Sequence, residues 1–207
     1  MALKKPLPEQ IAKLEKLNTT IIADTFDALG IHGVMSNMKP VISGKLLVGP
    51  AVTVKQRRLV PTPPSVRTPE AIESCDAGDV MVIDCGGDPY NGAWGGLLTL
   101  RAILYDVAGA VVGGAVRDTA EIREYRFPVW SEYVTPIGAN KRFCTVSIND
   151  VVECAGATVC PGDIIIADDD GVCVIPFESL DEVIKKAEEV YESEQKVINE
   201  LKSRKKQ

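Results

Sequence analysis

The sequence predicts one α/β domain with helices at both ends, and three observations support this prediction. The middle third alternates apolar runs with segments of helical spacing, which is typical of a β-α-β unit. The last third has short apolar runs separated by Asn-Asp, Pro-Gly-Asp and Asp-Asp-Gly, which are turn sequences. Both ends show helical periodicity, and no internal repeat or domain boundary interrupts residues 1–207.

The N-terminal segment, residues 1–30, predicts two helices. The first covers residues 8–17 and has a proline in its first turn. The second follows directly, with Asn18 or Thr19 as its N-terminal cap and Gly30 as its end.

The elements that follow predict the sheet. Residues 45–56 are rich in valine and predict a strand, after which an irregular loop with four prolines leads to a short helix. Buried strands then alternate with a glycine-rich loop and two helices. The expected elements are the loop 58–70, the helix 68–75, the strand 78–85, the glycine-rich loop 84–96, the helix 96–109, the strand 109–116, the helix 119–125 and the strand 127–135.

The C-terminal third predicts short strands over residues 142–176 and one long helix over residues 177–204. Apolar residues recur along this helix at three- and four-residue spacing, so the helix needs a partner surface. Glu194 lies inside the apolar stripe, and two interpretations stay open. In one interpretation Glu194, near the helix end, is simply exposed to water. In the other it contributes an acid to the site of a neighbouring subunit.

Composition and charge exclude several functional classes. The chain has 45% hydrophobic and 25% charged residues, as in ordinary globular proteins. Its net charge is −6, and no basic stripe precedes the last few residues, so we expect no nucleic-acid partner. No apolar run approaches the ~20 residues of a membrane helix, and the N-terminus lacks the apolar core of a secretion signal. We therefore expect a cytoplasmic protein without a membrane partner.

Cysteine and histidine usage narrows the chemistry further. The six cysteines are scattered without C-x-x-C spacing, so we expect free and mostly buried thiols. The one histidine, His32, lies in a glycine-flanked loop, which disfavours a Ser-His-Asp triad and a His-rich metal site. A metal in this protein would therefore take oxygen ligands, as Mg or Mn does.

Two loops at strand ends are the expected place for chemistry. In a β-α-β unit, the loops that leave the carboxyl ends of the strands lie at one edge, where ligands bind in open α/β sheets. One loop leads to a helix whose first amides belong to Gly95, Gly96, Leu97 and Leu98. A helix N-terminus favours an anion such as a carboxylate or phosphate. A tight turn without a ligand is the alternative interpretation.

The other loop carries Arg117 and Asp118, with Glu121 three residues later. The planar guanidinium of Arg117 matches a carboxylate in two-point contact, and Asp118 is a hard oxygen ligand suited to Mg or Mn. Glu121 would face the same way as Asp118, where it could order a metal-bound water or accept a proton. The alternative is that Arg117 and Asp118 make ordinary ion pairs and that Asp118 caps the next helix.

Longer segments resemble a known family. "GAWGGLLTLRAILYDVAGAVVGGAVRDTAEIREYRFPVW", "SEYVTPIGA" and "PGDIIIADDDGVCVIP" resemble the RraA-like family, which includes the 4-hydroxy-4-methyl-2-oxoglutarate/4-carboxy-4-hydroxy-2-oxoadipate aldolases. The resemblance extends from "TTIIADTFDALG" to the C-terminal helix. It implies an α/β/β sandwich and homotrimeric rings, sometimes stacked into homohexamers, with active sites between subunits. It also implies a divalent metal and short 2-oxo acid substrates from which pyruvate is released.

The resemblance also implies roles for single residues. Arg117 would bind the pyruvyl carboxylate and stabilise the enolate, Asp118 would be the direct metal ligand, and the amides of residues 95–98 would help to hold the pyruvyl group. Glu121 matches an acid of the aldolase branch, where the branch of ribonuclease regulators tends to have glycine.

A neighbouring subunit would complete the site. In the aldolases a glutamate of its C-terminal helix assists the waters at the metal, and Glu194, or less favourably Glu192, matches this role. One departure from the aldolases is Gly96, because many of them have an acid there. We expect this departure to affect the substrate, the affinity for the metal or the rate of the reaction.

The leading hypothesis is a metal-dependent lyase of the class II aldolase or oxaloacetate decarboxylase type, in which no lysine is suitably placed for Schiff-base chemistry. One alternative is a non-catalytic regulator of the RraA type that binds a ribonuclease or helicase. Another is a metal-dependent enzyme that acts on a different sugar acid or oxo acid.

Overall fold

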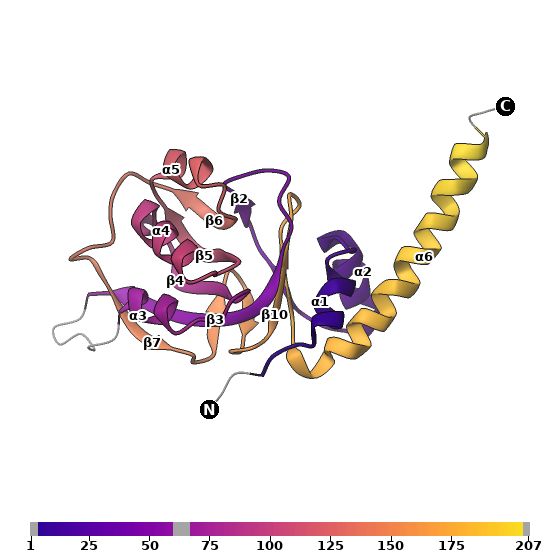
Figure 1. Ribbon diagram of the computed structural model, residues 1–207, viewed down its shortest axis with the longest axis horizontal. Helices are drawn as coiled ribbons and strands as arrows, with labels where there is room; N and C mark the ends of the chain where they lie inside the picture. The colour runs from indigo at the N-terminus through magenta and orange to yellow at the C-terminus, as the bar shows by residue number, and fades with distance from the viewer. Residues whose placement is uncertain (1–3, 60–66, 205–207) are drawn as a thin grey trace.

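The computed structural model describes residues 4–59 and 67–204 (Figure 1). It begins with helices α1 (Pro8–Leu14) and α2 (Thr19–Leu29) and ends with the short 3-10 helix η1 (Phe177–Ser179) and helix α6 (Leu180–Arg204). The predicted α/β class with helices at both ends is confirmed. The proline-rich loop that the sequence predicts falls partly on residues 60–66, which lie outside the described residues.

The two N-terminal helices have the ends that their sequence dictates, with one exception. The Asn18 side chain accepts a hydrogen bond of 2.9 Å from the Ile21 amide and so caps α2. Gly30 ends α2 in the left-handed region, at φ 68°, which favours glycine. Helix α1 is shorter than predicted, because it ends at Leu14 rather than at residue 17.

The strands form one large sheet and one separate hairpin. The hairpin consists of β8 (Val152–Cys154) and β9 (Ala157–Val159). The strands of the large sheet are β1 (Val34–Met35), β2 (Lys39–Pro40), β3 (Leu47–Arg58), β4 (Val80–Trp94), β5 (Gly109–Val116), β6 (Val129–Val134), β7 (Phe143–Ile148), β10 (Ile164–Ala167) and β11 (Val172–Ile175).

The centre of the large sheet is parallel and its margins are antiparallel. Its order is β1-β11-β10-β3-β4-β5-β6-β2, and β7 pairs with β3 beside this path. Strands β3, β4, β5 and β6 are parallel neighbours, whereas β10, β11 and β7 join in antiparallel fashion. The parallel strands therefore end at one common edge of the sheet.

One sequence prediction about this edge is wrong. The glycine-rich residues 84–96 are predicted as a loop, but β4 continues through them as far as Trp94. The pairing of β4 with β5 shifts register three times between Asp84 and Trp94. Gly86 and Gly87 have φ values of 64° and 68°, so these glycines allow an irregular strand rather than a free loop.

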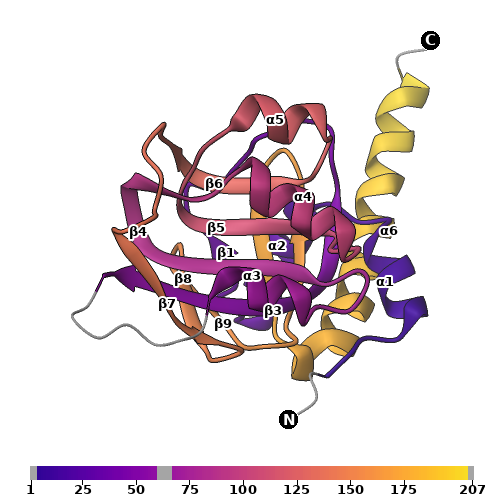
Figure 2. The same cartoon turned by 60° about the vertical axis from the view of Figure 1, so that its left-hand side comes forward.

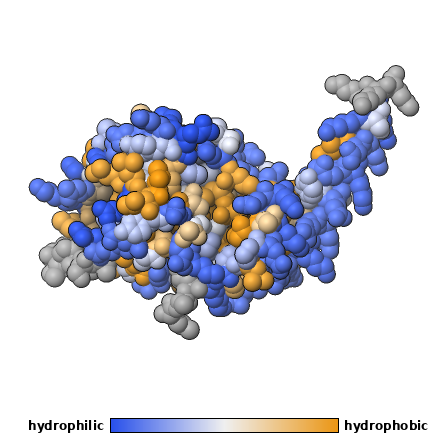
Figure 3. Space-filling view, in the orientation of Figure 1, coloured by the Kyte–Doolittle hydropathy of each residue, from blue (hydrophilic) through white to orange (hydrophobic). Residues whose placement is uncertain are grey.

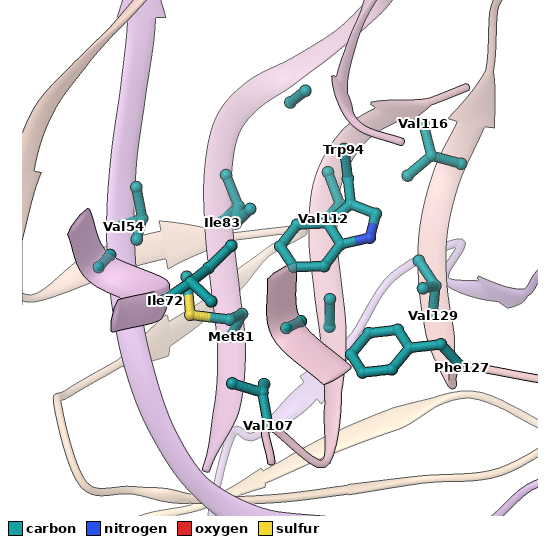
Figure 4. Close-up of a cluster of buried hydrophobic side chains, with 14 of the residues drawn as sticks. Val54, Ile72, Met81, Ile83, Trp94, Val107, Val112, Val116, Phe127 and Val129 are labelled. Atoms are coloured by element: carbon teal, nitrogen blue, oxygen red, sulfur yellow. The ribbon is translucent and has the colours of Figure 1, made fainter. Parts of the chain in front are cut away.

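Helices cover one face of the parallel strands. These helices are α3 (Thr68–Glu73), α4 (Gly96–Leu104) and α5 (Thr119–Glu124), which lie in front of the strands in Figure 2. The cluster of buried side chains between the two layers contains Trp94 stacked on Phe127, with ring centroids 6.1 Å apart (Figure 4). Trp94 Nε1 also donates a hydrogen bond of 2.9 Å to Thr99 Oγ1, which ties the end of β4 to the first turns of α4.

The opposite face and the margin of the sheet have cores of their own. The β8–β9 hairpin contributes to a second buried cluster, which includes Trp130. Helices α1, α2 and α6 pack on β10 and β11 through a third cluster. In the described part of the chain, no helix is long and apolar enough to cross a membrane.

Candidate active site

The loops predicted to carry chemistry meet at the carboxyl edge of the parallel strands. Strand β4 ends opposite the end of β5, where Trp94 pairs with Val116. Helix α4 therefore starts beside Arg117 and Asp118. The Arg117 amide donates a hydrogen bond of 2.9 Å to the Trp94 carbonyl, which holds the two chain segments together. This is the edge at which open α/β sheets bind ligands.

Arg117 lies among three glycines, of which Gly92 and Gly95 lie at the junction of β4 and α4 and Gly138 in a separate segment. A Cβ on Gly92 or Gly95 would lie 3.0 Å from a carbon of the Arg117 side chain, and a Cβ on Gly138 would lie 3.0 Å from its Nη1. Such separations are too short for ordinary contacts, so larger residues at these positions would push the arginine aside. Within residues 4–59 and 67–204, the one acid that pairs with Arg117 is Asp118, at 3.4 Å from Nε.

Asp118 stands at the N-cap position of α5, but its side chain does not cap that helix. Its backbone is in the left-handed region at φ 53°, which turns the carboxylate toward α4. There Oδ2 accepts a hydrogen bond of 3.2 Å from the Gly96 amide. The alternative that Asp118 caps the next helix is therefore wrong for its side chain. The other alternative, that Arg117 and Asp118 make ordinary ion pairs, holds in part, because Arg117 Nε lies 3.4 Å from Asp118 Oδ2.

Glu121 lies against the same helix start. A Cβ on Gly96 would lie 1.8 Å from Glu121 Oε2, so the glutamate occupies the space that a side chain at position 96 would need. Gly95, the N-cap residue of α4, offers no side chain to the free amides of the helix. Two carboxylates, those of Asp118 and Glu121, thus approach the positive end of α4.

A cavity of about 420 Å³ opens in front of this arrangement. Gly95, Leu97 and Leu98 line it from the start of α4, and Arg117 and Asp118 line it from the end of β5. Gly96 and Glu121 lie beside the cavity without lining it. The other lining residues are Pro69, Gly92, Ala93, Trp94, Arg101, Gly138, Ala139 and Asn140. Five of the predicted residues, Gly95, Leu97, Leu98, Arg117 and Asp118, thus meet at one cavity, and Leu97 is largely exposed there.

Glu194 is the predicted site residue that this chain does not bring to the cavity. It is exposed on α6, which projects from the body on the side away from α4 (Figure 1). The less favoured Glu192 is exposed on the same part of the helix. Neither glutamate lines the cavity of its own chain.

The donor set at Asp118 fits a magnesium-like ion. Among the described residues, no three His, Cys, Asp or Glu side chains gather into a metal cage. Mg²⁺ usually binds proteins through one or two carboxylates and keeps several waters, so it needs no such cage. Asp118 supplies one partly exposed carboxylate, and Oδ2 is the oxygen that bonds to Gly96. The residues that could hold Mg or Mn are therefore Asp118 directly and Glu121 at longer range.

Cysteine chemistry has no support at this edge. All six cysteines are free, and Cys85, Cys154 and Cys173 are buried. Burial raises the pKa of Cys75 and Cys173 to about 12, and it also raises the pKa of Cys85. These thiols stay protonated near neutral pH and are poor nucleophiles.

A larger cavity, of about 570 Å³, lies at the opposite edge of the sheet. Its walls come from α1 and from the starts of the parallel strands, and its charged lining includes Lys5 paired with Asp79. Among the described residues that line it, Lys5 is already paired with Asp79, and α1 begins there with Pro8, which has no amide hydrogen to donate. We therefore place the candidate active site in the smaller cavity.

Sequence reasoning missed Arg101, Pro69 and Asn140, which also line the candidate site. A signal for Arg101 existed, because it follows Leu97 by four residues on a predicted helix and so faces the same way. Pro69 and Asn140 come from segments whose position depends on the tertiary fold, and no local pattern identifies them.

Comparison with known proteins agrees with this geometry. The model of the RraA-like family, described as "Aldolase/RraA", matches residues 19–174. The chain belongs to the RraA-like family. A Halalkalibacterium halodurans relative named "Putative 4-hydroxy-4-methyl-2-oxoglutarate aldolase" is 34% identical over 86% of this chain and 81% of its own length. Protein DlpA of Legionella pneumophila is 34% identical over 92% of this chain, which spans 31% of that longer protein.

Solved structures of the RraA-like family have the same fold. Streptomyces coelicolor RraAS2, described as "an unusual member of the RNase ES inhibitor RraA protein family", superposes with a TM-score of 0.86 at 25% identity. That superposition covers 94% of this chain and 98% of RraAS2. An uncharacterized protein from Pseudomonas syringae reaches a TM-score of 0.87 at 25% identity, over 97% of this chain and 95% of the other.

Proposed function

We propose that this protein is a divalent-metal-dependent lyase that cleaves a C–C bond of a short 2-oxo acid and releases pyruvate. One observation carries the proposal: Arg117, Asp118 and the first amides of α4 converge on one cavity, with the Gly96 amide 3.2 Å from Asp118 Oδ2. The names of the aldolase relatives support the reaction class.

Arg117 is placed to bind the 2-oxo acid by its C1 carboxylate. The guanidinium has several donors, and the three surrounding glycines leave room for the side chain to lie along the cavity wall. The free amides at the start of α4 add further donors and a partial positive charge. Together they would bind the oxygen-rich end of a pyruvyl group.

Asp118 would hold Mg or Mn, with Glu121 positioned to hydrogen-bond a water nearby. When bound, the divalent metal supplies Lewis-acid stabilisation of negative charge on the keto oxygen. The hydrogen bond from Gly96 and the nearby Arg117 keep Asp118 oriented.

In the retro-aldol reaction, a base takes the proton of the substrate's 4-hydroxyl group. The C3–C4 bond then breaks, its electron pair moves to the keto oxygen as the enolate of pyruvate, and the hydroxyl carbon leaves as a ketone. Arg117 stabilises the developing charge, and C3 finally accepts a proton. Our candidate base is a water that Glu121, exposed beside the cavity, would hydrogen-bond, and Glu194 of a neighbouring subunit is the second candidate for this supporting acid.

Decarboxylation of oxaloacetate would use the same groups. Its C3–C4 bond breaks with loss of carbon dioxide and leaves the same enolate, so no base is needed for a hydroxyl proton. One site can therefore support both reactions.

We further propose that the active form is a homotrimer or a homohexamer. Exposed apolar side chains on α4 and on the outer part of α6 support an assembly of this kind (Figure 3). These exposed side chains include Leu97, Leu100, Leu104, Val197 and Leu201.

The deciding experiment measures pyruvate release from 4-hydroxy-4-methyl-2-oxoglutarate and from oxaloacetate. We expect turnover with Mg or Mn, loss of turnover with EDTA, and loss of turnover in Asp118→Ala. Asp27→Ala is the matched control, because Asp27 is exposed on α2 and away from the cavity. Failure of the wild type to release pyruvate from either substrate at high enzyme concentration would contradict the proposal for these substrates.

The second candidate function is regulation of a ribonuclease by binding. The close superposition with RraAS2 favours it. A regulator acts through its surface, so Asp118→Ala should then inhibit a ribonuclease as well as the wild type does. The lyase function predicts instead that the wild type releases pyruvate and that Asp118→Ala abolishes this release.

A further inference from the structure

A second arginine lies in the candidate active site. Arg101 projects from α4 into the same cavity that Arg117 and Asp118 line. Its guanidinium pairs with Glu73, at the end of α3, and both side chains are about half exposed, at 43% and 40%. Nothing in the proposed pyruvate-releasing chemistry uses this second cation.

The two arginines reach the cavity from different elements, Arg117 from the end of β5 and Arg101 from α4. Arg101 follows Gly96 by five residues, which corresponds to about 7.5 Å of backbone along the axis of α4. The start of the helix, beside Arg117, is the end that we assign to the pyruvyl group. The backbone of Arg101 is thus displaced from that end by a length on the scale of a short dicarboxylate.

Part of the cavity wall is apolar. Pro69, Ala93 and Leu98 line it, so this part suits the carbon chain of a substrate rather than another charged group. Asn140 lines the cavity as well and offers an amide to a hydroxyl or a carboxylate. Two cations and apolar side chains in one cavity match a short acid with a carboxylate at each end.

The present partner of Arg101 is easily exchanged. A half-exposed ion pair contributes little free energy, because water and salt screen it. A substrate carboxylate could replace Glu73 and keep the two-point geometry that a guanidinium offers. Glu73 therefore acts as a competitor for Arg101 and not as an essential support.

We infer that Arg101 is a specificity-determining residue that binds the distal carboxylate of the substrate, so that the site selects 2-oxo acids with a second carboxylate. The inference rests on the proposed function for its assignment of the near end of the substrate. It adds which residue recognises the far end.

The test is equilibrium binding of two matched acids in the presence of Mg²⁺, measured by calorimetry. 2-Oxoglutarate has the distal carboxylate, and 2-oxopentanoate has a methyl group in its place. Neither has the 4-hydroxyl group that the retro-aldol cleavage needs. We expect the wild type to bind 2-oxoglutarate roughly 10- to 100-fold more tightly, the effect of one charged hydrogen-bonded pair.

Two variants separate recognition from a structural role, because each removes the same ion pair. Arg101→Gln should abolish the preference for 2-oxoglutarate and leave 2-oxopentanoate binding unchanged. Glu73→Gln should strengthen 2-oxoglutarate binding by about 2- to 5-fold, because it removes the competitor. Arg101→Lys, which keeps the charge but loses the fork, should retain part of the preference.

Equal binding of the two acids by the wild type would overturn the inference, and so would equal losses in Arg101→Gln and Glu73→Gln. The proposed function fails separately, through the absence of pyruvate release. A preference for 2-oxoglutarate that depends on Arg101 would then still support the role of this residue.

Discussion

Two carboxylates share the small space in front of the first turn of α4. Asp118 is hydrogen-bonded to the Gly96 amide, and Glu121 lies where a side chain at position 96 would be. Many aldolases that the sequence resembles have an acid at that position. Here the glycine makes the room that Glu121 occupies, so the acid at this place comes from α5 instead of from α4.

Gly96→Ala should therefore lower kcat by about tenfold or more while the fold persists, because the new methyl group displaces Glu121 from its position. The stability of the fold should not fall, since alanine is favoured over glycine in helices by roughly 0.5–1 kcal/mol. Steady-state kinetics and thermal unfolding of the variant check both statements. In a Glu121→Gln background the same substitution should have a much smaller effect. An unchanged effect in that background would mean that the two positions are not coupled.

A different carboxylate, Glu132 on β6, predicts a pH effect on stability. Its Oε2 is buried without a hydrogen-bond partner among the described residues. Burial, and then the nearby charge of Asp84, raise the pKa of Glu132 above its ordinary value of 4.5. The wild type is therefore destabilised as pH rises through the raised pKa.

Glu132→Gln removes this charge and should raise the melting temperature at pH 7. Because Glu132 is partly exposed, water screens the repulsion, and we expect a gain of only about 1–2 °C. The gain should vanish below about pH 4.5, where the wild-type side chain is protonated too. Glu124→Gln, an exposed acid on α5, is the control. A gain that is the same at pH 4 and pH 7 would rule out a titration of Glu132 as its cause.

Position at strand ends was enough to predict Arg117, Asp118 and the amide segment from the sequence. The left-handed backbone of Asp118 was not predictable, because an aspartate before a helix ordinarily caps it. To predict that Arg101 lines the site, one would have to know which face of α4 meets the cavity.

Among the elements, α6 differs most between its two halves. Its buried residues are Leu180, Val183, Ile184 and Ala187, all in the first half, which packs on α2 and the margin of the sheet. The outer half carries Tyr191, Val197 and Leu201 on the same helical face, but they are exposed. This half of the helix extends beyond the body (Figure 1). Its exposed apolar side chains indicate a surface for a partner.

The double variant Val197→Glu with Leu201→Glu should dissociate the proposed oligomer and leave the subunit folded, because neither side chain packs in the core of its own chain. Sedimentation velocity and circular dichroism would report assembly and fold separately. The matched control places the same charges at Asn199 and Ser203, on the opposite face of the helix. If both double variants remain assembled, the outer stripe is not the contact surface.

Strand β4 shows why some elements resist prediction from sequence. Five glycines in residues 84–96 indicate a loop by composition. Pairing with β5, which only the tertiary fold brings alongside, keeps the segment extended through its register shifts. Strand β5 was predictable from "GAVVGGAV" because both of its faces are buried and its sequence is apolar throughout.

At the scale of the whole molecule, the α/β class and the helical ends followed from periodicity alone. The order of the strands did not, because β7 and β10 pair with β3, and β11 pairs with β1, from a long way along the chain. The candidate site is likewise only partly assembled by one chain. That chain brings together the groups to which we assign anion binding, whereas Glu194 lies away from them.

Mixed oligomers would test whether Glu194 acts on a neighbouring subunit. Glu194→Gln alone should lower kcat by about 10- to 100-fold without changing the assembly. Coexpression of Glu194→Gln with Asp118→Ala should restore activity to roughly a quarter of the wild-type rate, because random assembly creates some sites with both acids. No recovery in verified mixed oligomers would exclude a shared site.

The three glycines around Arg117 also determine when conformational entropy is lost. A free arginine side chain has about 2 kcal/mol of rotamer entropy, which a flexible binding residue gives up when its ligand arrives. Here the backbone of Gly92, Gly95 and Gly138 lies against the side chain, which is 39% exposed. Part of the rotamer entropy is therefore lost already on folding, so ordering of the protein would reduce the binding free energy of a carboxylate at Arg117 less. A bulkier residue at any of these glycines would weaken anion binding even though the arginine itself is unchanged.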